Sequence, residues 1–197
     1  MEKTMDQPKV PASKIAYRRQ SQIENCLYEN LLTRPYPSVS ISDICLQLDI
    51  SRKSFYNYFP DKDSCFRSLI SRKLHKCILH LTTFPESNAS QEDFIAGYLS
   101  FWQKEKNLLD IIVRNNLVCL LMDQCIHFLQ KENQIILPFL NTPQLQADSF
   151  VLSCFVSTQI TLILQWFMQD FEPPLEEMVQ TYQRLVYQPL LGRKETD

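Results

Sequence analysis

The amino-acid sequence predicts an all-α fold of about nine helices, and three observations support this prediction. Apolar residues recur at helical spacing through almost all of the 197 residues. Glycine occurs only at Gly97 and Gly192, which leaves few positions for the tight turns of β-hairpins. Prolines such as Pro35, Pro60 and Pro85 separate the helical segments instead, because proline cannot continue a helix.

The composition is that of a globular chain, and it excludes several classes of chemistry. A hydrophobic content of 45% suits one composite unit or two closely packed helical domains. The scarcity of glycine excludes Walker and Rossmann nucleotide loops, and no hydrolase or metalloprotease motif is present. The sequence therefore predicts neither an enzyme nor a cofactor. Cys77 and His80 could share a helix face, but no further ligand accompanies them, so no metal site is expected.

Cysteine usage and the two ends of the sequence indicate a reduced, cytoplasmic setting. The seven cysteines form an odd set without C-x-x-C clusters, which favours reduced, buried thiols. The basic N-terminal residues have no apolar segment after them, so no secretory signal is expected. The apolar stretches are interrupted by Ser, Thr and Gln before they reach the ~20 residues of a membrane span.

Charge is distributed unevenly along the chain. Residues 1–76 hold 13 Lys and Arg against 8 Asp and Glu, whereas residues 77–197 hold 7 against 14. A basic head on an acidic body suggests that only the head meets a polyanion. A randomly solvated surface would explain a difference of this size equally well.

The first 60 residues predict two helices and a turn that leads to a third helix. Residues 14–33 have an apolar stripe, and the prolines after them end that helix. Ser40 and Asp43 form a variant capping box for a short second helix. Asp49 then lies in a turn, and Ser51 can cap the third helix.

The arrangement of two helices about a tight turn predicts a helix-turn-helix. The second helix of such a motif presents its first residues to base edges, and here those residues are Arg52, Lys53 and Ser54. Pro60 should end this helix. Asp61 can cap a fourth helix running to about Leu81, whose first turn places Lys62 where free amides already favour a phosphate.

Residues 41–70 resemble the helix-turn-helix of TetR-family regulators. The resemblance covers residues 14–75 with the first helix, and it is strongest at Ile44, Ser51, Phe55, Tyr56, Tyr58, Phe59, Lys62 and Phe66. It implies that Tyr56 and Lys62 contact the DNA backbone, that Tyr58 or Asn57 adds phosphate contacts, and that Arg52, Lys53 and Ser54 read bases. It assigns Phe55 and Phe59 to the core.

Two positions depart from the family pattern. Cys45 stands where the family usually has alanine, a conservative change in size. Asp49 stands where the family usually has a glycine in the turn. Aspartate tolerates the left-handed conformation better than most residues, so we expect the turn to be retained.

The rest of the chain predicts a helical body, with helices near 91–104, 106–115, 117–133, 144–169 and 174–190. We therefore divide the chain into a flexible arm (1–13), a DNA-binding domain (14–76) and a regulatory and dimerisation domain (77–197). The 144–169 segment is apolar on several faces and must be covered on several sides. Its resemblance to the penultimate TetR-family helix implies a homodimer held by a four-helix bundle.

Family members typically bind a small inducer in the body, so the resemblance also implies a pocket there. The candidate lining residues are aromatic or apolar groups with a few polar ones, although core packing explains each of them singly. They are Tyr98, Phe101, Trp102, Met122, Phe155, Gln159, Leu162 and Trp166.

Two functions are compatible with these features. The first is a sequence-specific transcriptional regulator, a homodimer that binds a palindromic operator in double-stranded DNA. We expect it to be a repressor that a small-molecule inducer releases from the operator, although the sequence does not distinguish repression from activation. The alternative is a TetR-fold coactivator that binds protein and not DNA. Retention of Arg52, Lys53 and Lys62 favours the first, because a coactivator has no need of basic donors.

Overall fold

The structure is a computed structural model that describes residues 14–82, 90–131 and 149–188. Every regular element in these ranges is helical, with nine α-helices, a 3-10 helix η1 (Tyr36–Ser38) and a π-helical turn η2 (Gln183–Tyr187). The predicted all-α fold is confirmed. The proposed arm, residues 1–13, lies outside the described residues.

Four helices build the N-terminal end of the molecule. They are α1 (Lys14–Thr33), α2 (Ile41–Gln47), α3 (Arg52–Tyr56) and α4 (Lys62–Thr82). The predicted first helix has the observed bounds, and the fourth ends one residue beyond Leu81. In contrast, α3 ends before the predicted stop at Pro60, because the Tyr58 amide donates to the Phe55 carbonyl at 2.9 Å in a tighter turn.

Five further helices form the body, and their bounds agree closely with the sequence-based prediction. They are α5 (Gln91–Lys104), α6 (Lys106–Arg114), α7 (Val118–Lys131), α10 (Ser149–Met168) and α11 (Leu175–Tyr182), which continues into η2. The predicted end at residue 133, the start at 144 and the end at 190 lie outside the described residues.

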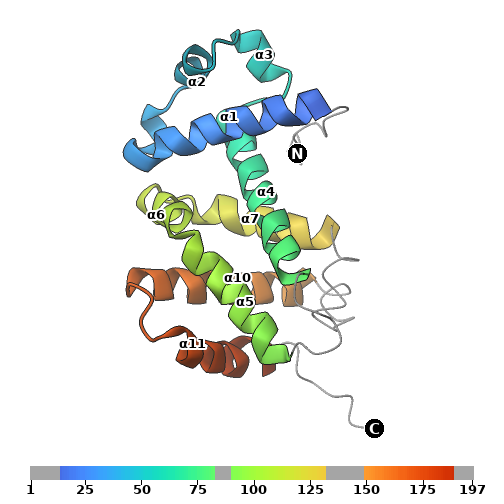
Figure 1. Cartoon of the computed structure of the whole chain (residues 1–197), viewed down its shortest axis with the longest axis vertical. Helices are drawn as coiled ribbons and strands as arrows, with labels where there is room; N and C mark the ends of the chain where they lie inside the picture. Colours follow the sequence, from blue (N-terminus) through green and yellow to red (C-terminus); the bar gives the residue numbers. More distant parts are fainter. Residues whose placement is uncertain (1–13, 83–89, 132–148, 189–197) are drawn as a thin grey trace.

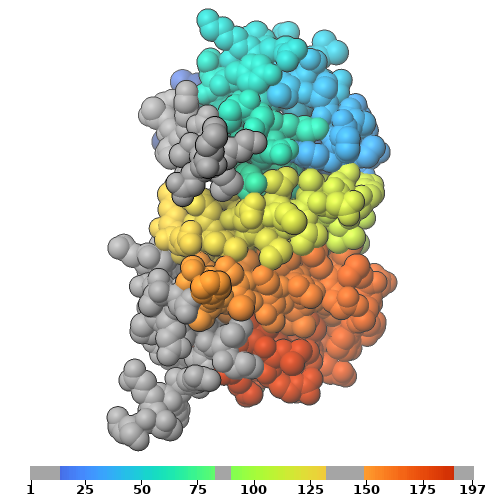
Figure 2. Space-filling view, turned by 180° about the vertical axis from the view of Figure 1, so that it is seen from behind, coloured from blue at the N-terminus to red at the C-terminus, as the bar shows by residue number. Residues whose placement is uncertain are grey.

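The long helix α4 joins the two ends of the molecule. It packs against α1 on the N-terminal side and against α5 and α7 in the body. Figure 1 places α2 and α3 at one end and α11 at the other, and in Figure 2 α7 forms a band between the N-terminal helices and α10. The predicted domain boundary at residues 76 and 77 falls inside α4, so this helix belongs to both parts.

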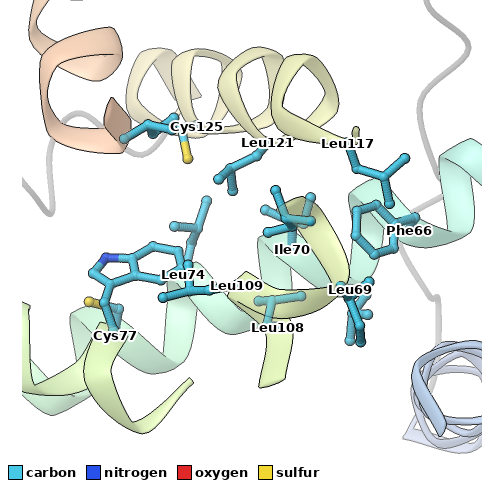
Figure 3. Packing of buried hydrophobic residues seen from close by; sticks show 14 of the residues in the cluster. Phe66, Leu69, Ile70, Leu74, Cys77, Leu108, Leu109, Leu117, Leu121 and Cys125 are labelled. Atoms are coloured by element: carbon cyan, nitrogen blue, oxygen red, sulfur yellow. The ribbon is translucent and has the colours of Figure 1, made fainter. Parts of the chain in front are cut away.

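The interior between α4, α6 and α7 is apolar and closely packed. Figure 3 shows side chains from the three elements meeting there. Phe66, Ile70 and Leu108 are all 0% exposed, so this part of the core is fully closed to solvent. Burial of this kind contributes roughly 25 cal/mol per Å² of apolar surface. The other residues labelled in the figure are Leu69, Leu74, Cys77, Leu109, Leu117, Leu121 and Cys125.

Helix α10 has the length and composition that a membrane span also has, with 20 residues and no charged side chain. The Ser, Thr and Gln residues that interrupt its apolar runs therefore do not keep the helix as a whole below the length of a membrane span. Eight residues of α10 are buried within the fold, among them Phe155 and Trp166. A core helix satisfies the same criterion, and its several apolar faces are covered by α5, α6, α7 and η2.

The cysteines agree with the sequence-based interpretation in part. All seven are free thiols, and Cys26, Cys45, Cys65, Cys77 and Cys125 are buried. Cys119 and Cys154 are exposed, because they face outward on α7 and α10.

Candidate nucleic-acid interface and ligand cavity

The start of α2 is fixed by a reciprocal cap, as the sequence predicted. The Ser40 hydroxyl accepts from the Asp43 amide at 3.1 Å, and the Asp43 carboxylate accepts from the Ser40 amide at 2.9 Å. Arg34 adds an ion pair to the same carboxylate at 3.1 Å. Hydrogen bonds from Ser40, followed by the Arg34 interaction, hold the pKa of Asp43 below its ordinary value. The cap therefore carries a negative charge where the helix dipole favours one.

The turn between α2 and α3 accommodates aspartate where the family usually has glycine. Asp49 has a φ of 50°, in the left-handed region. Its amide donates to the Leu46 carbonyl at 3.3 Å, and the Ile50 amide donates to the Cys45 carbonyl at 3.0 Å. The carbonyls at the end of α2 are thus satisfied, and the predicted turn is retained.

The first turn of α3 presents two basic side chains to solvent. Ser51 caps the helix by accepting from the Ser54 amide at 3.1 Å. The Ser54 hydroxyl lies 3.0 Å from the Ser51 hydroxyl, so it is engaged in the cap. Arg52 and Lys53 are exposed, and no described carboxylate forms an ion pair with either. Their donors are available to an external acceptor.

Tyr56 holds Arg52 along the surface of α3. The Arg52 guanidinium donates to the Tyr56 hydroxyl at 3.2 Å, and its carbon lies 5.9 Å from the ring centroid. The two residues are four apart and therefore share one helix face. Tyr56 is 43% exposed, so this pair forms a surface of one cation and one phenol.

Aromatic residues on the opposite face anchor α3 to the rest of the domain. Phe55 and Phe59 are both 0% exposed, which confirms their assignment to the core. Their ring centroids are 5.8 Å apart, and Tyr56 meets Phe55 edge-on at 5.7 Å. Asn57 is exposed and Tyr58 is half-buried against the core. The anchors fix the direction in which the exposed side chains project.

Lys62 lies at the start of α4 as predicted, but its ammonium group contacts the protein. It donates to the Tyr36 carbonyl at 2.6 Å and to the Val39 carbonyl at 2.8 Å. Its nitrogen also lies 4.1 Å from the centre of the Tyr36 ring. Burial lowers the pKa of Lys62, opposed by the nearby Asp63 carboxylate. An ammonium group has three protons, so one remains for an external acceptor.

Sequence reasoning missed Tyr36, which connects three segments. Its hydroxyl donates to Asp63 at 2.6 Å, and its amide donates to the Asn115 side chain at 2.6 Å. Burial and the hydrogen bond with Asp63 raise its pKa far above the ordinary tyrosine value. The available signal was its position between Pro35 and Pro37, where fixed backbone angles orient a side chain.

A cavity of about 110 Å³ lies in the body, and it takes four of the eight predicted pocket residues. Tyr98, Trp102, Phe155 and Gln159 line it. Sequence reasoning missed several further lining residues, which come from α4, α7, α11 and η2. They include Cys77, Ile78, Cys125, Phe128, Tyr182 and Tyr187.

The other four predicted residues lie outside the cavity lining, although they come from the same helices. Phe101 follows Tyr98 by one turn of α5, and Met122 precedes Cys125 by one turn of α7. Leu162 and Trp166 lie beyond Gln159 on α10. The Trp166 indole donates instead to the Pro173 carbonyl at 2.7 Å, which ties α10 to the segment before α11.

Comparison with known proteins identifies the N-terminal domain. Residues 29–69 match the model of the family described as bacterial regulatory proteins, tetR family. The matched residues contain η1, α2, α3 and the first part of α4, the elements that carry the exposed donors. The N-terminal domain is thus similar to the DNA-binding part of tetR-family regulators over these residues.

A relative with a curated function is similar over part of the chain. The HTH-type transcriptional regulator EthR of Mycobacterium tuberculosis is 35% identical over 65 residues. This alignment covers 32% of the present chain and 30% of EthR. The similarity in sequence thus extends over less than a third of that relative.

Solved structures extend the TetR likeness to the whole fold. A TetR-family transcriptional regulator from Syntrophomonas wolfei matches with a TM-score of 0.59 at 14% identity, covering 92% of this chain and 99% of the other. The fatty acid degradation regulator FadR from Bacillus halodurans matches with a TM-score of 0.54 at 16% identity, covering 90% of this chain and 96% of FadR. The repressor AlkX from Dietzia matches with a TM-score of 0.57 at 14% identity, covering 93% of this chain and 98% of AlkX. At these identities the likeness shows the TetR fold alone.

Polar contacts tie the TetR-type domain to the body. Arg114 at the end of α6 donates to the Leu31 carbonyl at 2.7 Å, in the last turn of α1. Lys73 on α4 bonds both carboxylate oxygens of Glu105, at 2.6 and 2.8 Å, where α5 meets α6. Both parts therefore share one connected framework.

Proposed function

We propose that this chain is a transcriptional regulator that reads a DNA sequence through α3. The observation that carries the proposal is the two exposed basic side chains, Arg52 and Lys53, neither of them in an ion pair with a described carboxylate, on the first turn of a capped helix in a TetR-type domain. Bidentate contact of arginine with guanine is the commonest specific contact in the major groove. EthR, which resembles this domain, is itself named a transcriptional regulator.

The proposed division of labour within the interface follows from exposure and contacts. Arg52, Lys53 and Ser54 read base edges, with Ser54 the least available because its hydroxyl is engaged in the cap. Tyr56 and Asn57 are exposed and contact phosphates. Tyr58 and Lys62 add phosphate contacts from half-buried positions at the edge of the interface.

We further propose a homodimer formed by α10 and α11. One face of α10 exposes Cys154, Thr161, Gln165 and Met168, spaced seven, four and three residues apart, and the whole helix carries no charge. An uncharged face of this kind can pack closely against a second copy. Dimerisation would set two α3 helices about 34–36 Å apart, the separation of half-sites on one face of DNA.

Control by a small molecule in the cavity would act through α4. This helix contributes Leu74, Cys77 and Ile78 to the cavity lining and begins at Lys62 in the proposed DNA interface. Because α4 is continuous, a shift of its second half would reorient α3 in each subunit. The regulator would act in the cytoplasm and be released from a palindromic operator when the ligand binds.

The test is a selection of bound sequences from random duplex DNA, carried out with the full chain and three variants. Arg52→Ala should relax the preference at one base position of each half-site, by about tenfold in affinity. Asn57→Ala removes an exposed side chain assigned to phosphate contact and should weaken binding to all sequences alike. Lys76→Ala removes one exposed positive charge on α4, away from α3, and should leave the selected sequence unchanged.

Two results would contradict the proposal. An unchanged sequence preference in Arg52→Ala would remove that residue from base reading. The absence of any enriched sequence with the unmodified chain would favour a coactivator that binds protein and not DNA.

A further inference from the structure

The described lining of the cavity in the body carries no charged residue. None of its described lining residues is Lys, Arg, His, Asp or Glu. Burial raises the pKa of the Cys77 thiol, and it raises the pKa of Cys125 to about 12, so both thiols are protonated at neutral pH. Burial likewise raises the pKa of the Tyr98 and Tyr182 phenols well above the ordinary value. A charged ligand would find no counter-ion among these lining residues.

Four polar side chains nevertheless face this apolar space. They are Tyr98, Trp102, Gln159 and Tyr182. The Trp102 indole nitrogen is fully enclosed and makes no hydrogen bond of good geometry, although it lies near enough to the Tyr98 hydroxyl to oppose the rise in the Tyr98 pKa. Trp102, Tyr182 and Gln159 are only 3%, 5% and 8% exposed. Buried polar groups are ordinarily paired, so an enclosed indole N–H without a well-placed acceptor at the wall of a cavity calls for a further partner.

These polar groups lie close together. The Tyr98 ring centroid is 6.4 Å from that of Trp102 and 5.9 Å from that of Tyr182. Gln159 approaches the same cavity from α10. One small oxygen-bearing group could therefore accept a hydrogen bond from the indole while its apolar remainder contacts the rings and aliphatic side chains.

We propose that the cavity binds an uncharged, mainly apolar molecule with one neutral hydrogen-bond acceptor, such as a carbonyl oxygen, that pairs with the Trp102 indole. This inference rests on the proposed role of the cavity as an effector site. Its volume of about 110 Å³ is of the same order as the roughly 150 Å³ cavity that holds one benzene ring. The matching ligand carries one ring or an aliphatic chain of similar bulk.

The experiment measures binding of four single-ring probes to the full chain by calorimetry, without DNA. Acetophenone has the neutral acceptor, ethylbenzene lacks it, and benzoate and benzylamine carry opposite charges. Acetophenone should bind about three- to tenfold more tightly than ethylbenzene, as one additional hydrogen bond allows. Both charged probes should bind at least roughly a hundredfold more weakly than acetophenone, because their ions would be buried unpaired.

Variants assign the acceptor contact to one residue. Trp102→Phe should abolish the preference for acetophenone over ethylbenzene while changing ethylbenzene affinity less than about twofold. Tyr28→Phe removes a hydroxyl from a residue outside the cavity lining and should leave both affinities unchanged. The comparison of the four probes on the unmodified chain stands even if a cavity variant does not fold.

Each outcome decides the inference. Equal affinities for acetophenone and ethylbenzene, tighter binding of either charged probe, or no binding of any probe would overturn it. Because DNA is absent, a chain that prefers acetophenone but selects no DNA sequence would uphold the ligand class and refute the proposed regulator. A chain that selects a DNA sequence but binds none of the four probes would uphold the proposed regulator and refute the ligand class.

Discussion

Removing the buried carboxylate of Glu24 should destabilise the packing of α1 on α4 more than any surface change in the same helix. Glu24 is 2% exposed and accepts hydrogen bonds from Arg72 at 2.5 Å, Ser68 at 2.7 Å and Gln20 at 3.3 Å. Glu24→Ala leaves all three donors without this acceptor. Breaking a buried ion pair on one side costs ~3–5 kcal/mol.

The lower end of that range applies here, because Arg72 keeps a second partner. Its guanidinium also donates to the exposed Asn25 side chain at 2.6 Å. We therefore expect Glu24→Ala to lose about 3 kcal/mol of unfolding free energy. For a chain of this size such a loss lowers Tm by roughly 6–12 °C.

The assay is urea unfolding followed by circular dichroism, with Glu29→Ala as the matched control on the exposed face of α1. The control should change the unfolding free energy by less than about 0.5 kcal/mol. The double variant Glu24→Ala/Arg72→Ala should lose less unfolding free energy than the sum of the losses in the two single variants. The reason is that Arg72→Ala removes the charge that Glu24→Ala leaves unpaired. A loss below about 1 kcal/mol in Glu24→Ala would refute the role given to this network.

Three further predictions concern the elements that position α3. Phe55→Ala should cost ~3–5 kcal/mol in urea unfolding, whereas Leu46→Ala, at a side chain 83% exposed, should cost almost nothing; similar losses in both would contradict the assignment of Phe55 to the core. The lowered pKa of Asp43 stabilises the fold above the ordinary carboxyl pKa of about 3.9, and this contribution is lost as pH falls through the lowered value. Asp43→Asn should therefore flatten stability between pH 5 and 2, and an unchanged acid limb would be inconsistent with the cap. Arg114→Ala should lower the unfolding free energy by ~0.5–1.5 kcal/mol, because it removes the hydrogen bond to the Leu31 carbonyl. Asp110 is the exposed ion-pair partner of Arg114, so Asp110→Ala should cost less. The reverse order would show that the surface ion pair matters more than the hydrogen bond.

Local features were predictable from the sequence because they depend on neighbours within a few residues. The caps at Ser40, Ser51 and Asp61 need only a side chain and an amide three positions ahead, and the structure confirms all three. The left-handed Asp49 follows from the same local reasoning about turns. The order and approximate bounds of the helices follow from apolar period and proline positions.

Contacts between distant segments were not predictable in this way. The two carbonyls that hold Lys62 lie 26 and 23 residues earlier in the chain, so no spacing rule marks them. The local sequence around Tyr36 does not predict its contact with Asn115, 79 residues later. Such pairs depend on how whole helices pack.

The cavity shows the same limit in another form. Helical period indicates which face of a helix points inward, and Phe101 and Tyr98 share such a face on α5. It does not indicate how far along the helix a cavity extends, so Leu162 and Trp166 were assigned to a pocket whose lining on α10 ends before them, at Ile160. Depth along a helix is set by the packing of its neighbours.

The measurement that tests the central claim most directly is the affinity of the full chain for its selected duplex against a scrambled duplex, at several salt concentrations. We predict a preference of at least ~10³ for the selected sequence at physiological salt, with two subunits per palindromic duplex and affinity that falls steeply as salt rises. Equal affinity for both duplexes would contradict the account, because it would show that the exposed Arg52 and Lys53 of α3 do not read sequence.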